Sequence, residues 1–468
     1  MQTVLVSVPV ALVGVVDSLS GLFGRVVDRA GARGLEAQVH EGLKEVDRAF
    51  MSACVRQKAR EAVESDTQEV VCPHCGQWAE LLNPQAKRHV VTLRGRVDYR
   101  RPVYQCSQRE CRKQRAPFDE ELGLGPKEHF SPLVQQKAAW AGGTMTSYGL
   151  AAKDMLRQAE IPVSEKQIHR ITERTAQRAL ELQEEEVRHF GRPAVADQAV
   201  EVKERPETLV LELDGTCAMG RDGVGHDVKV ATVFGLDARA KTGSPGKERP
   251  LLLRRAYCGT SRGIQPFRAM VWALCVMWGI RSARRLVVLG DGADWIWNFS
   301  RERFHFTLAD GTVEAPIEIL DYYHATENLA KGRDAIFGDP EGKPAKEWYE
   351  RWREAIWEGR VAELIEELEA RSKRGASPAK RDELRVRAQY FRTHAGRMHY
   401  PEYRAMDLPI GSGAIEGTCK NLVKGRMACV GQRWGVEDGI ERMTALRVRI
   451  FNERYDDLWK TPAERLAA

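Results

Sequence analysis

The sequence has little excess charge, few cysteines and almost no long apolar runs. Its 72 lysines and arginines stand against 66 aspartates and glutamates, which excludes the charge imbalance of a disordered polyelectrolyte. Ten cysteines among 468 residues are too sparse for a small fold stapled by disulfides, and they indicate a reducing compartment. The length exceeds what one ordinary core holds, so we expect several domains.

The one long apolar stretch opens the chain, "MQTVLVSVPVALVGVVDSLSGLFGRVV" at residues 1–27. No Lys or Arg precedes Arg25, and Pro9 and Asp17 interrupt the run. A signal peptide begins with basic residues, and a membrane span needs about 20 apolar residues in a row. We therefore expect a cytoplasmic protein without a membrane partner, with a helical lead-in over residues 1–66.

Four cysteines form two closely spaced pairs. Cys72 and Cys75 lie in "VCPHCGQW", and Cys106 and Cys111 lie in "YQCSQRECRKQ". Paired thiolates on tight turns suit tetrahedral zinc, and the stretch between the pairs alternates like two strands. The sequence predicts a zinc ribbon over residues 67–120 with one structural Zn²⁺. The alternative is two unrelated cysteine pairs in a reduced protein.

Basic residues crowd the same segment. Residues 87–115 hold ten lysines and arginines but only two acidic residues. Such an excess on a small module favours contacts with nucleic-acid phosphates, although a merely solvated face is the alternative. The residues that we expect to bind DNA here are Arg94, Arg96, Arg100 and Arg101.

Residues 121–200 have helical periodicity throughout. "YGLAAKDMLRQAE" and "EKQIHRITERTAQR" flank a short turn, and Ser164 with Gln167 forms a capping box at the start of the second helix. This pattern predicts a helix-turn-helix-like DNA-binding region, with Gln167, Arg170 and Arg174 on the outer face of the second helix. The alternative is a helical hairpin that binds nothing.

Two apolar strands run into an aspartate followed by glycine. Asp214 ends the strand in "LVLELDG", where the chain then breaks at Gly215, and Asp291 ends the strand in "RRLVVLGDG". Three strands, a helix, a strand, a helix, a strand and a helix are expected over residues 205–335, which is the order of a ribonuclease-H-like core. Its two aspartates would lie side by side and repel unless divalent cations bridge them.

A third carboxylate stands downstream in "GSGAIEGTCKNLVKGRM". Glu416 enters a helix on which Lys420 and Lys424 share one side, and a phosphodiester could lie over them. The alternative is a first-turn glutamate favoured by the helix dipole. Residues 336–405 read as a helical insertion with tryptophans on a core-facing side, and residues 406–468 as completion of the core with C-terminal helices.

The motifs "LELDGT", "GDGADWIWN", "DYYHATENL" and "GSGAIEGTCKNLVKGRM" resemble those of DDE transposases of bacterial insertion sequences, in the ISKra-type group related to mutator-like elements. The resemblance covers about residues 205–450. It implies that Asp214, Asp291 and Glu416 form the catalytic triad and hold two Mg²⁺ or Mn²⁺ ions. It also implies that Asp321 and His324 are the auxiliary D-x-x-H signature; a hydrogen bond at the strand end is the structural alternative for His324.

The resemblance implies a multidomain α+β enzyme that hydrolyses DNA at element ends and transfers the 3'-hydroxyl into target DNA. Its partners would be double-stranded DNA, as terminal inverted repeats and target, and further copies of the chain as a homo-oligomer at the bacterial nucleoid. Lys420, Lys424 and Arg426 would contact this DNA. Two alternatives stay open: a structure-selective nuclease on the same core, and a domesticated zinc-ribbon protein that only binds DNA.

Overall fold

The computed structural model describes residues 32–64, 70–192, 206–242, 249–280, 283–307, 313–374, 377–435, 438–461 and 464. The apolar opening of the chain lies outside these residues. The chain divides into two compact units, Met1–Thr172 (unit 1) and Glu173–Ala468 (unit 2). Each unit is described by itself below.

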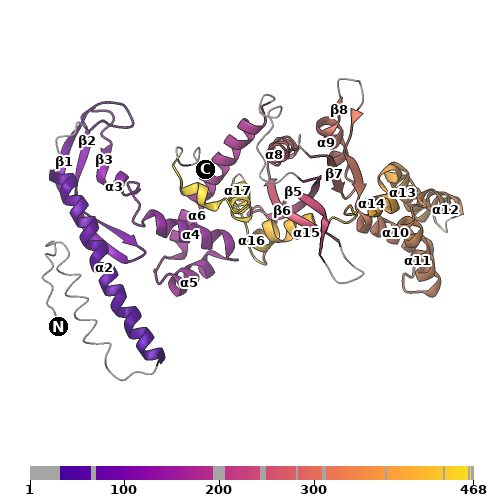
Figure 1. Ribbon diagram of the computed structural model, residues 1–468, viewed down its shortest axis with the longest axis horizontal. Coiled ribbons are helices and arrows are strands. Elements are labelled where there is room, and N and C mark those ends of the chain that lie inside the picture. The colour runs from indigo at the N-terminus through magenta and orange to yellow at the C-terminus, as the bar shows by residue number, and fades with distance from the viewer. Residues whose placement is uncertain are drawn as a thin grey trace. The chain divides into compact units, whose positions relative to one another are not determined.

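Unit 1 combines a long helix with a small antiparallel sheet (Figure 1). Helix α2 spans Ala32–Glu64, and the sheet has the order β1-β2-β3. The buried side chains of Val55 and Ala59 on α2 pack with those of Val97 and Tyr99 on β2. This shared core fixes the helix on the hairpin. The strands are β1 (Ala79–Thr92), β2 (Gly95–Cys106) and β3 (Gln114–Arg115).

Four helices follow the sheet: α3 (Pro117–Glu121), α4 (Pro132–Thr144), α5 (Tyr148–Gln158) and α6 (Glu165–Phe190). The predicted capping box at the start of α6 is confirmed. The backbone N–H of Ser164 donates to the Gln167 side chain at 2.9 Å, and the N–H of Gln167 donates to the Ser164 hydroxyl at 3.4 Å. These bonds satisfy donors at the helix start that have no partner within the helix.

Unit 2 is built on a five-stranded mixed sheet with the order β10-β7-β4-β5-β6. Strands β4, β5 and β6 form an antiparallel meander, while β7 and β10 run parallel to β4. The element order expected from the sequence is the one found, with a small β8–β9 hairpin added. The strands are β4 (Thr208–Met219), β5 (Gly225–Thr242), β6 (Arg249–Thr260), β7 (Arg285–Gly290), β8 (Phe306–Thr307), β9 (Val313–Glu314) and β10 (Ile317–Leu320).

The expectation that the first strand ends at Asp214 is wrong. Strand β4 continues through Gly215, because its antiparallel pairing with β5 extends to Met219. Its parallel pairing with β7 stops at Leu213. Asp214 therefore marks the end of the parallel part of the sheet rather than the end of the strand.

Helices cover this sheet and form the predicted insertion. Helix α8 packs on β5 and β6, α17 packs on β6, and α10 packs on α11 and α13. In the insertion, Trp348 and Trp352 are buried, as expected for core positions, while Trp357 is 38% exposed. The helices are α8 (Ile264–Met277), α9 (Asp294–Phe304), α10 (Tyr322–Phe337), α11 (Lys343–Trp357), α12 (Val361–Arg374), α13 (Pro378–His394), α14 (Tyr400–Ala405) and α17 (Gly439–Phe451).

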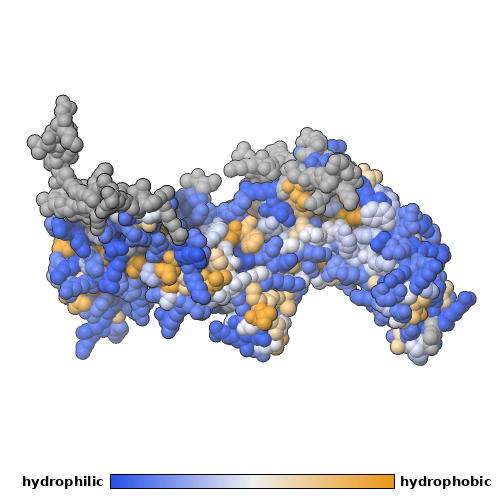
Figure 2. All heavy atoms as spheres, turned by 90° about the horizontal axis from the view of Figure 1, so that it is seen from below, coloured by the Kyte–Doolittle hydropathy of each residue, from blue (hydrophilic) through white to orange (hydrophobic). Residues whose placement is uncertain are grey.

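The surface mixes hydrophilic residues with small groups of hydrophobic ones (Figure 2). Exposed large hydrophobic side chains include Trp78, Leu133 and Val430. Within the described ranges, no helix combines the length and the apolar character needed to cross a membrane.

Candidate functional site

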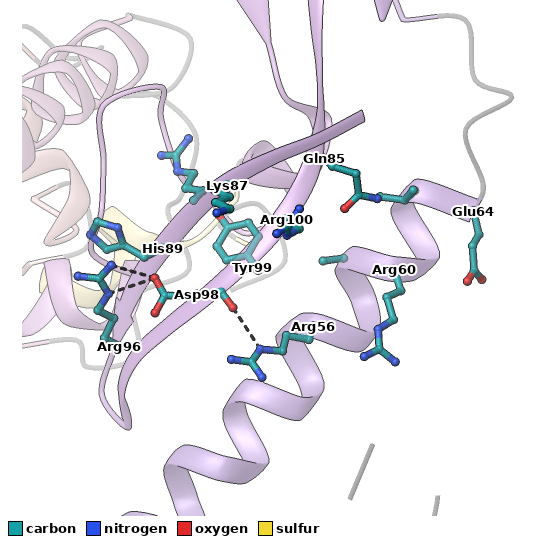
Figure 3. A pocket seen from close by; sticks show the side chains of 13 residues that line it. Arg56, Arg60, Glu64, Gln85, Lys87, His89, Arg96, Asp98, Tyr99 and Arg100 are labelled. Atoms are coloured by element: carbon teal, nitrogen blue, oxygen red, sulfur yellow. Dashed lines mark hydrogen bonds and ion pairs between the residues drawn. The ribbon is translucent and has the colours of Figure 1, made fainter. Parts of the chain in front are cut away.

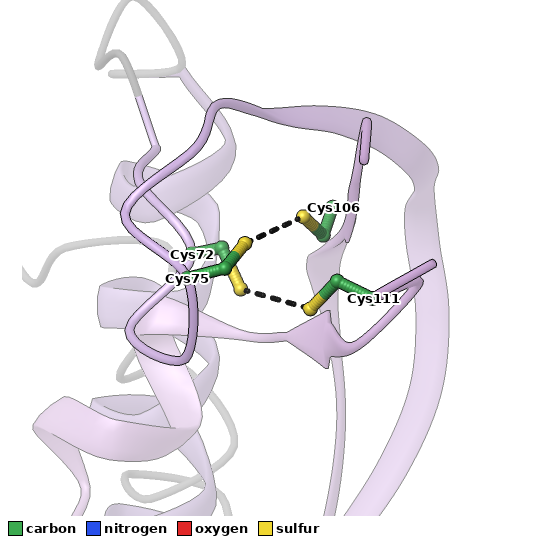
Figure 4. A group of neighbouring side chains, drawn as sticks. All are labelled: Cys72, Cys75, Cys106 and Cys111. Atoms are coloured by element: carbon green, nitrogen blue, oxygen red, sulfur yellow. Dashed lines mark hydrogen bonds between the residues drawn. The ribbon is translucent and has the colours of Figure 1, made fainter. Parts of the chain in front are cut away.

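Four thiols of unit 1 converge on one point (Figure 4). The sulfur atoms of Cys75 and Cys106 are 3.4 Å apart, and those of Cys72 and Cys111 are 3.8 Å apart. All four sulfurs lie within 4.8 Å of one another. Zn–S bonds of about 2.3 Å place the sulfurs of a tetrahedral site roughly 3.8 Å apart, so the cluster can hold a structural metal such as zinc.

Backbone geometry prepares the first cysteine turn for a metal. The N–H groups of His74 and Cys75 point at the sulfur of Cys72 and lower the pKa of its thiol to about 7. A lower pKa favours the thiolate, which is the form that binds metal. Gly76 has a φ of 72°, a left-handed conformation that glycine adopts without strain and that closes the turn.

Three of the four arginines expected to bind DNA are exposed on the hairpin. Arg94 forms an ion pair of 2.7 Å with Asp47 on α2, and Arg96 forms one of 2.9 Å with Asp98. Both pairs are largely exposed, so they are weak and can open when a phosphate approaches. Arg100 is exposed, and no carboxylate of the described chain pairs with it.

Arg101 has a different environment. Its side chain is 11% exposed, and its Nε lies 3.0 Å from a carboxylate oxygen of Asp119, which also accepts hydrogen bonds from Arg88 and from the hydroxyl of Tyr99. This buried network ties α3 to the sheet. Arg101 therefore has a structural role, and its guanidinium group is not part of the exposed basic surface of the hairpin.

The three residues expected to read DNA bases are all exposed on α6. Gln167 belongs to the capping box, and its side-chain oxygen accepts hydrogen bonds from the N–H and the hydroxyl of Ser164. Arg170 and Arg174 follow on successive helical turns. Gln167 thus has a role in starting the helix whether or not it contacts DNA.

The acidic residues of unit 2 gather where the parallel part of the sheet, formed by β4, β7 and β10, ends. The registers of β4 with β7 and of β7 with β10 align the residues immediately before Asp214, Asp291 and Asp321 in one row. Asp214, Asp291 and Asp321 are therefore each the next residue after this row, on β4 and just beyond β7 and β10. The predicted proximity of Asp214 and Asp291 arises from this register.

Asp214 is partly buried and surrounded by charge. Burial raises the pKa of its carboxyl group, and the negative charge of Asp291 raises this pKa further, while the nearby His324 lowers it. One carboxylate oxygen accepts the N–H of Gly215 at 2.6 Å, and the other accepts the thiol of Cys419 at 3.5 Å. The ionised form of Asp214 thus lacks a full positive counterpart among the described residues.

The backbone conformation at position 292, directly after Asp291, requires glycine. Gly292 has a φ of 103°, and a Cβ built on it would lie 3.1 Å from a Leu320 methyl carbon and 3.2 Å from the hydroxyl oxygen of Tyr390. The Asp291 carboxylate accepts the N–H of Ala293 at 2.9 Å across this turn. Only glycine fits here without strain, which holds Asp291 at the strand end.

Asp321 is fully buried and bonds only to the backbone in the contacts observed. One oxygen of its carboxylate caps α10 by accepting the N–H groups of Tyr323 at 2.6 Å and His324 at 3.0 Å. The other oxygen accepts the N–H of Ser412, which lies far downstream in the chain. Asp321 therefore has an anchoring role, while His324 pairs with Glu327 at 3.5 Å and its charge lowers the pKa of Asp214.

Glu212 makes a second anchor of the same kind. Its side chain is buried on β4 and accepts the N–H of Ile415 at 2.7 Å. Burial raises the pKa of Glu212 to about 8, and the charges of Asp321 and Glu416 contribute to the same direction. Two buried acids thus hold the turn at residues 411–415 against the sheet.

Glu416 follows this anchored turn and is exposed. It lies in α15 (Gly413–Thr418), which continues as the π-helix η3 (Cys419–Lys424) and the short α16 (Gly425–Met427). Buried Arg447 donates to the carbonyls of Leu422 and Asn421 in the π-helix. The sequence predicts one continuous α-helix here, whereas the structure has a widened turn, a feature often found at functional sites.

The three basic residues of this segment separate into two groups. Lys420 and Lys424 are exposed on the π-helix. Arg426 is 2% exposed, and its guanidinium carbon lies 4.8 Å from the centre of the Trp434 ring. Lys420 and Lys424 remain available to a phosphate, whereas Arg426 packs within the protein.

Sequence reasoning missed Glu212, Ser412 and Cys419. Glu212 had a visible signal, because an acidic residue two positions before Asp214 in an apolar strand shares its face. Ser412 and Cys419 take part through contacts that span about 90 and 200 residues, and local spacing carries no trace of them.

The acidic cluster is looser than the thiol cluster. In the part of the chain that the structure describes, the four cysteines are the only set of three or more potential metal ligands whose atoms all lie within 4.8 Å of one another. No protein-family model and no curated protein matches the chain.

Proposed function

We propose that the chain is a DDE-type DNA transposase, similar to bacterial insertion-sequence enzymes of the ISKra-type group. The observation that carries this proposal is the alignment of Asp214 and Asp291 on adjacent strands where their parallel pairing ends, with Glu416 in a helix that follows a turn anchored to the same sheet. Three antiparallel strands joined to two parallel ones support a ribonuclease-H-like core.

The acidic cluster fits a hard divalent cation. Its candidate ligands are carboxylate oxygens, which Mg²⁺ and Mn²⁺ prefer. Burial raises the pKa of Asp214 and the charge of Asp291 adds to this rise; a cation between the two carboxylates would remove their repulsion. Asp214, Asp291 and Glu416 would hold two such ions, and the chemistry that the ions would supply is activation of an attacking hydroxyl and stabilisation of the leaving oxygen.

The chain itself would position the DNA strand. Lys420 and Lys424 are exposed just after Glu416 and would bind phosphates beside the scissile bond. His324, whose charge acts on Asp214, would contact a phosphate of the same strand. Direct attack by water, and then by the freed 3'-hydroxyl on target DNA, needs no Ser or Tyr nucleophile.

Unit 1 would hold the element end. The thiol cluster with zinc would stabilise the hairpin that carries Arg94, Arg96 and Arg100. The α5–α6 pair would act as a helix-turn-helix reader through Gln167 and Arg170, together with Arg174 just beyond the boundary of unit 1 on the same helix. The exposed cations of these residues support this role.

The proposal is tested with purified full-length protein, end-containing duplex, Mg²⁺ and a target plasmid. Asp214→Asn, Asp291→Asn and Glu416→Gln should each reduce cleavage and joining to background while DNA binding persists, because an amide keeps the shape but loses metal affinity. Asp294→Asn, one helical turn beyond Asp291 and exposed, is the matched control and should stay active.

Each outcome has a distinct meaning. A triad variant with wild-type cleavage removes that residue from the triad. Cleavage without joining in the wild type supports the nuclease alternative, and binding without cleavage supports a protein that only binds DNA.

A further inference from the structure

We propose that a hollow between α2 and the β1–β2 hairpin binds the phosphate backbone of double-stranded DNA. The hollow has a volume of about 770 Å³ and lies within unit 1 (Figure 3). The choice of DNA as the partner rests on the proposed function. The hollow itself was not expected from the sequence, which assigns α2 only to a helical lead-in.

Cations line both walls of the hollow. Arg56 and Arg60 lie one turn apart on α2, with Cβ atoms typically about 6 Å apart, and Lys87 and Arg100 lie on the two strands opposite (Figure 3). All four side chains belong to exposed residues. The hollow therefore presents positive charge from two directions to whatever enters it.

The hairpin keeps two like charges directly opposite each other. Lys87 of β1 and Arg100 of β2 are partners in the strand register, an arrangement that destabilises a hairpin when nothing lies between the charges. Among the described residues, neither of them nor Arg60 forms an ion pair. An anion shared by Lys87 and Arg100 would turn this repulsion into binding energy.

The carboxylates of the hollow do not offset these cations. Asp98 is already paired with Arg96 at 2.9 Å, and its backbone carbonyl accepts a hydrogen bond from Arg56 at 3.2 Å. Arg88 also lines the hollow, but its guanidinium is directed to the protein interior, where it bonds to Asp119 and to the carbonyls of Gly125 and Glu128. Glu64, at the end of α2, is the remaining acid. Arg60, Lys87 and Arg100 are thus the three cations of the hollow for which the described residues show no polar partner, and Arg56 keeps its charge because a backbone carbonyl does not neutralise it.

The aromatic groups of the hollow favour duplex over single-stranded nucleic acid. Sites for single strands usually stack exposed bases on free aromatic rings. Here the hydroxyl of Tyr99 donates to Asp119 at 2.7 Å, and the ring of His89 stacks on that of His129 with centroids 4.6 Å apart. A ligand would therefore meet charge without a stacking platform, which suits a backbone whose bases are already paired.

The test measures duplex binding as a function of salt. The full-length chain carries Asp214→Asn so that nothing is cut, and the duplex has a random sequence. The hollow variant changes Arg60→Gln, Lys87→Gln and Arg100→Gln. The control variant removes the same charge from three exposed lysines of unit 1 outside the hollow, with Lys58→Gln, Lys127→Gln and Lys137→Gln.

The hollow variant should flatten the plot of log affinity against log salt by between two and three units, since each lost phosphate contact removes about 0.9. The control should change the slope by less than one unit. A charge-conserving variant with Arg60→Lys, Lys87→Arg and Arg100→Lys should keep the wild-type slope, which separates loss of charge from misfolding.

Equal slopes for the hollow and control variants would overturn the inference, as would tighter binding of single-stranded RNA than of duplex DNA at the hollow. Displacement of duplex by millimolar inorganic phosphate would overturn it in favour of a small-anion site. These readouts are independent of cleavage, so an inactive wild type that still shows the slope difference would refute the transposase proposal and support the hollow.

Discussion

At the residue scale, the acids of unit 2 have two kinds of environment. Asp214, Asp291 and Glu416 are partly or fully exposed, whereas Glu212 and Asp321 are buried and accept backbone N–H groups. The buried acids contact the turn that precedes Glu416. We infer that Glu212 and Asp321 hold Glu416 in position and do not themselves bind a metal ion or the DNA.

The anchoring role of Glu212 predicts a difference between two substitutions. With a pKa of about 8 the side chain is largely neutral at pH 7, so Glu212→Gln keeps both its charge state and an acceptor for the Ile415 N–H. Glu212→Leu leaves that buried N–H without a partner, which costs about 1–3 kcal/mol. We expect near-normal cleavage for Gln and a loss on the order of a hundredfold for Leu.

Cleavage rates and chemical unfolding of both variants check this prediction. The metal dependence of cleavage is the readout that a merely structural role would leave unchanged, and Glu212→Leu should need more Mg²⁺. If Leu and Gln behave alike in rate and metal dependence, Glu212 does not position Glu416.

His394 predicts how stability depends on pH. It is buried beside Tyr390, and burial lowers its pKa, with the charge of Arg397 acting in the same direction and those of Asp294 and Asp291 opposing. The unfolded chain therefore takes up the proton first as pH falls below about 6.5. The stability that neutral His394 provides is complete above that pH and is lost on acidification.

Thermal unfolding between pH 7 and 5.5, measured without added divalent metal, tests this effect. His394→Phe keeps a ring in the same space and should make the melting temperature less sensitive to pH than in the wild type. Parallel pH profiles for the two proteins would contradict the prediction.

At the element scale, the sequence predicts what depends on local pattern. The cluster of the paired cysteines, the capping box at Ser164, the order of strands and helices in unit 2 and the helices within residues 336–405 are all found. Each follows from periodicity or from a motif a few residues long.

The features that sequence reasoning missed depend on long-range packing. The continuation of β4 past Asp214 follows from its pairing with β5, and the burial of Arg101 and Arg426 follows from Asp119 and Trp434. The hollow in unit 1 exists because α2 packs on the hairpin. Spacing along the chain does not encode these contacts.

The thiol cluster predicts one structural metal per chain. Cys106→Ser should release zinc, because three thiolates without a fourth bind it much more weakly, and the two cysteine turns should then unfold. Cys54→Ser, an exposed cysteine on α2, is the control and should keep the metal. Elemental analysis of reduced protein checks both variants, and a wild type without metal would reject the zinc site.

The α6 helix predicts where specificity for the element end resides. Arg170→Ala with Arg174→Ala should reduce the preference for element-end over random duplex, since base contacts carry sequence information. Gln167→Glu keeps an acceptor for the capping box and tests base contact without unwinding the helix. Unchanged preference in a competition assay for both variants would mean that α6 is only a scaffold.

At the scale of the whole molecule, the proposed reaction joins two element ends to one target. One chain has one acidic cluster among its described residues, so we expect a homo-oligomer on DNA. Light scattering should show a multiple of 52.8 kDa plus DNA when element ends are present. The same mass with random duplex, or a single chain with element ends, would contradict this expectation.

The anchors at Asp321 also bear on the helical insertion as a whole. The chain leaves the sheet at Asp321 and returns at Ser412, whose N–H bonds to that same carboxylate, while the Tyr322 N–H bonds to the Ile410 carbonyl at 2.8 Å. The segment that leaves the sheet and the segment that returns to it are thus hydrogen-bonded to each other where they meet the sheet. Within this excursion Tyr390 of α13 and Tyr400 of α14 also donate to the carbonyls of Asp291 and Leu320, so these two helices are bound to the site. The outer helices α11 and α12 could be lengthened or shortened during evolution without moving Glu416, so this part of the insertion can diversify while the chemistry stays fixed.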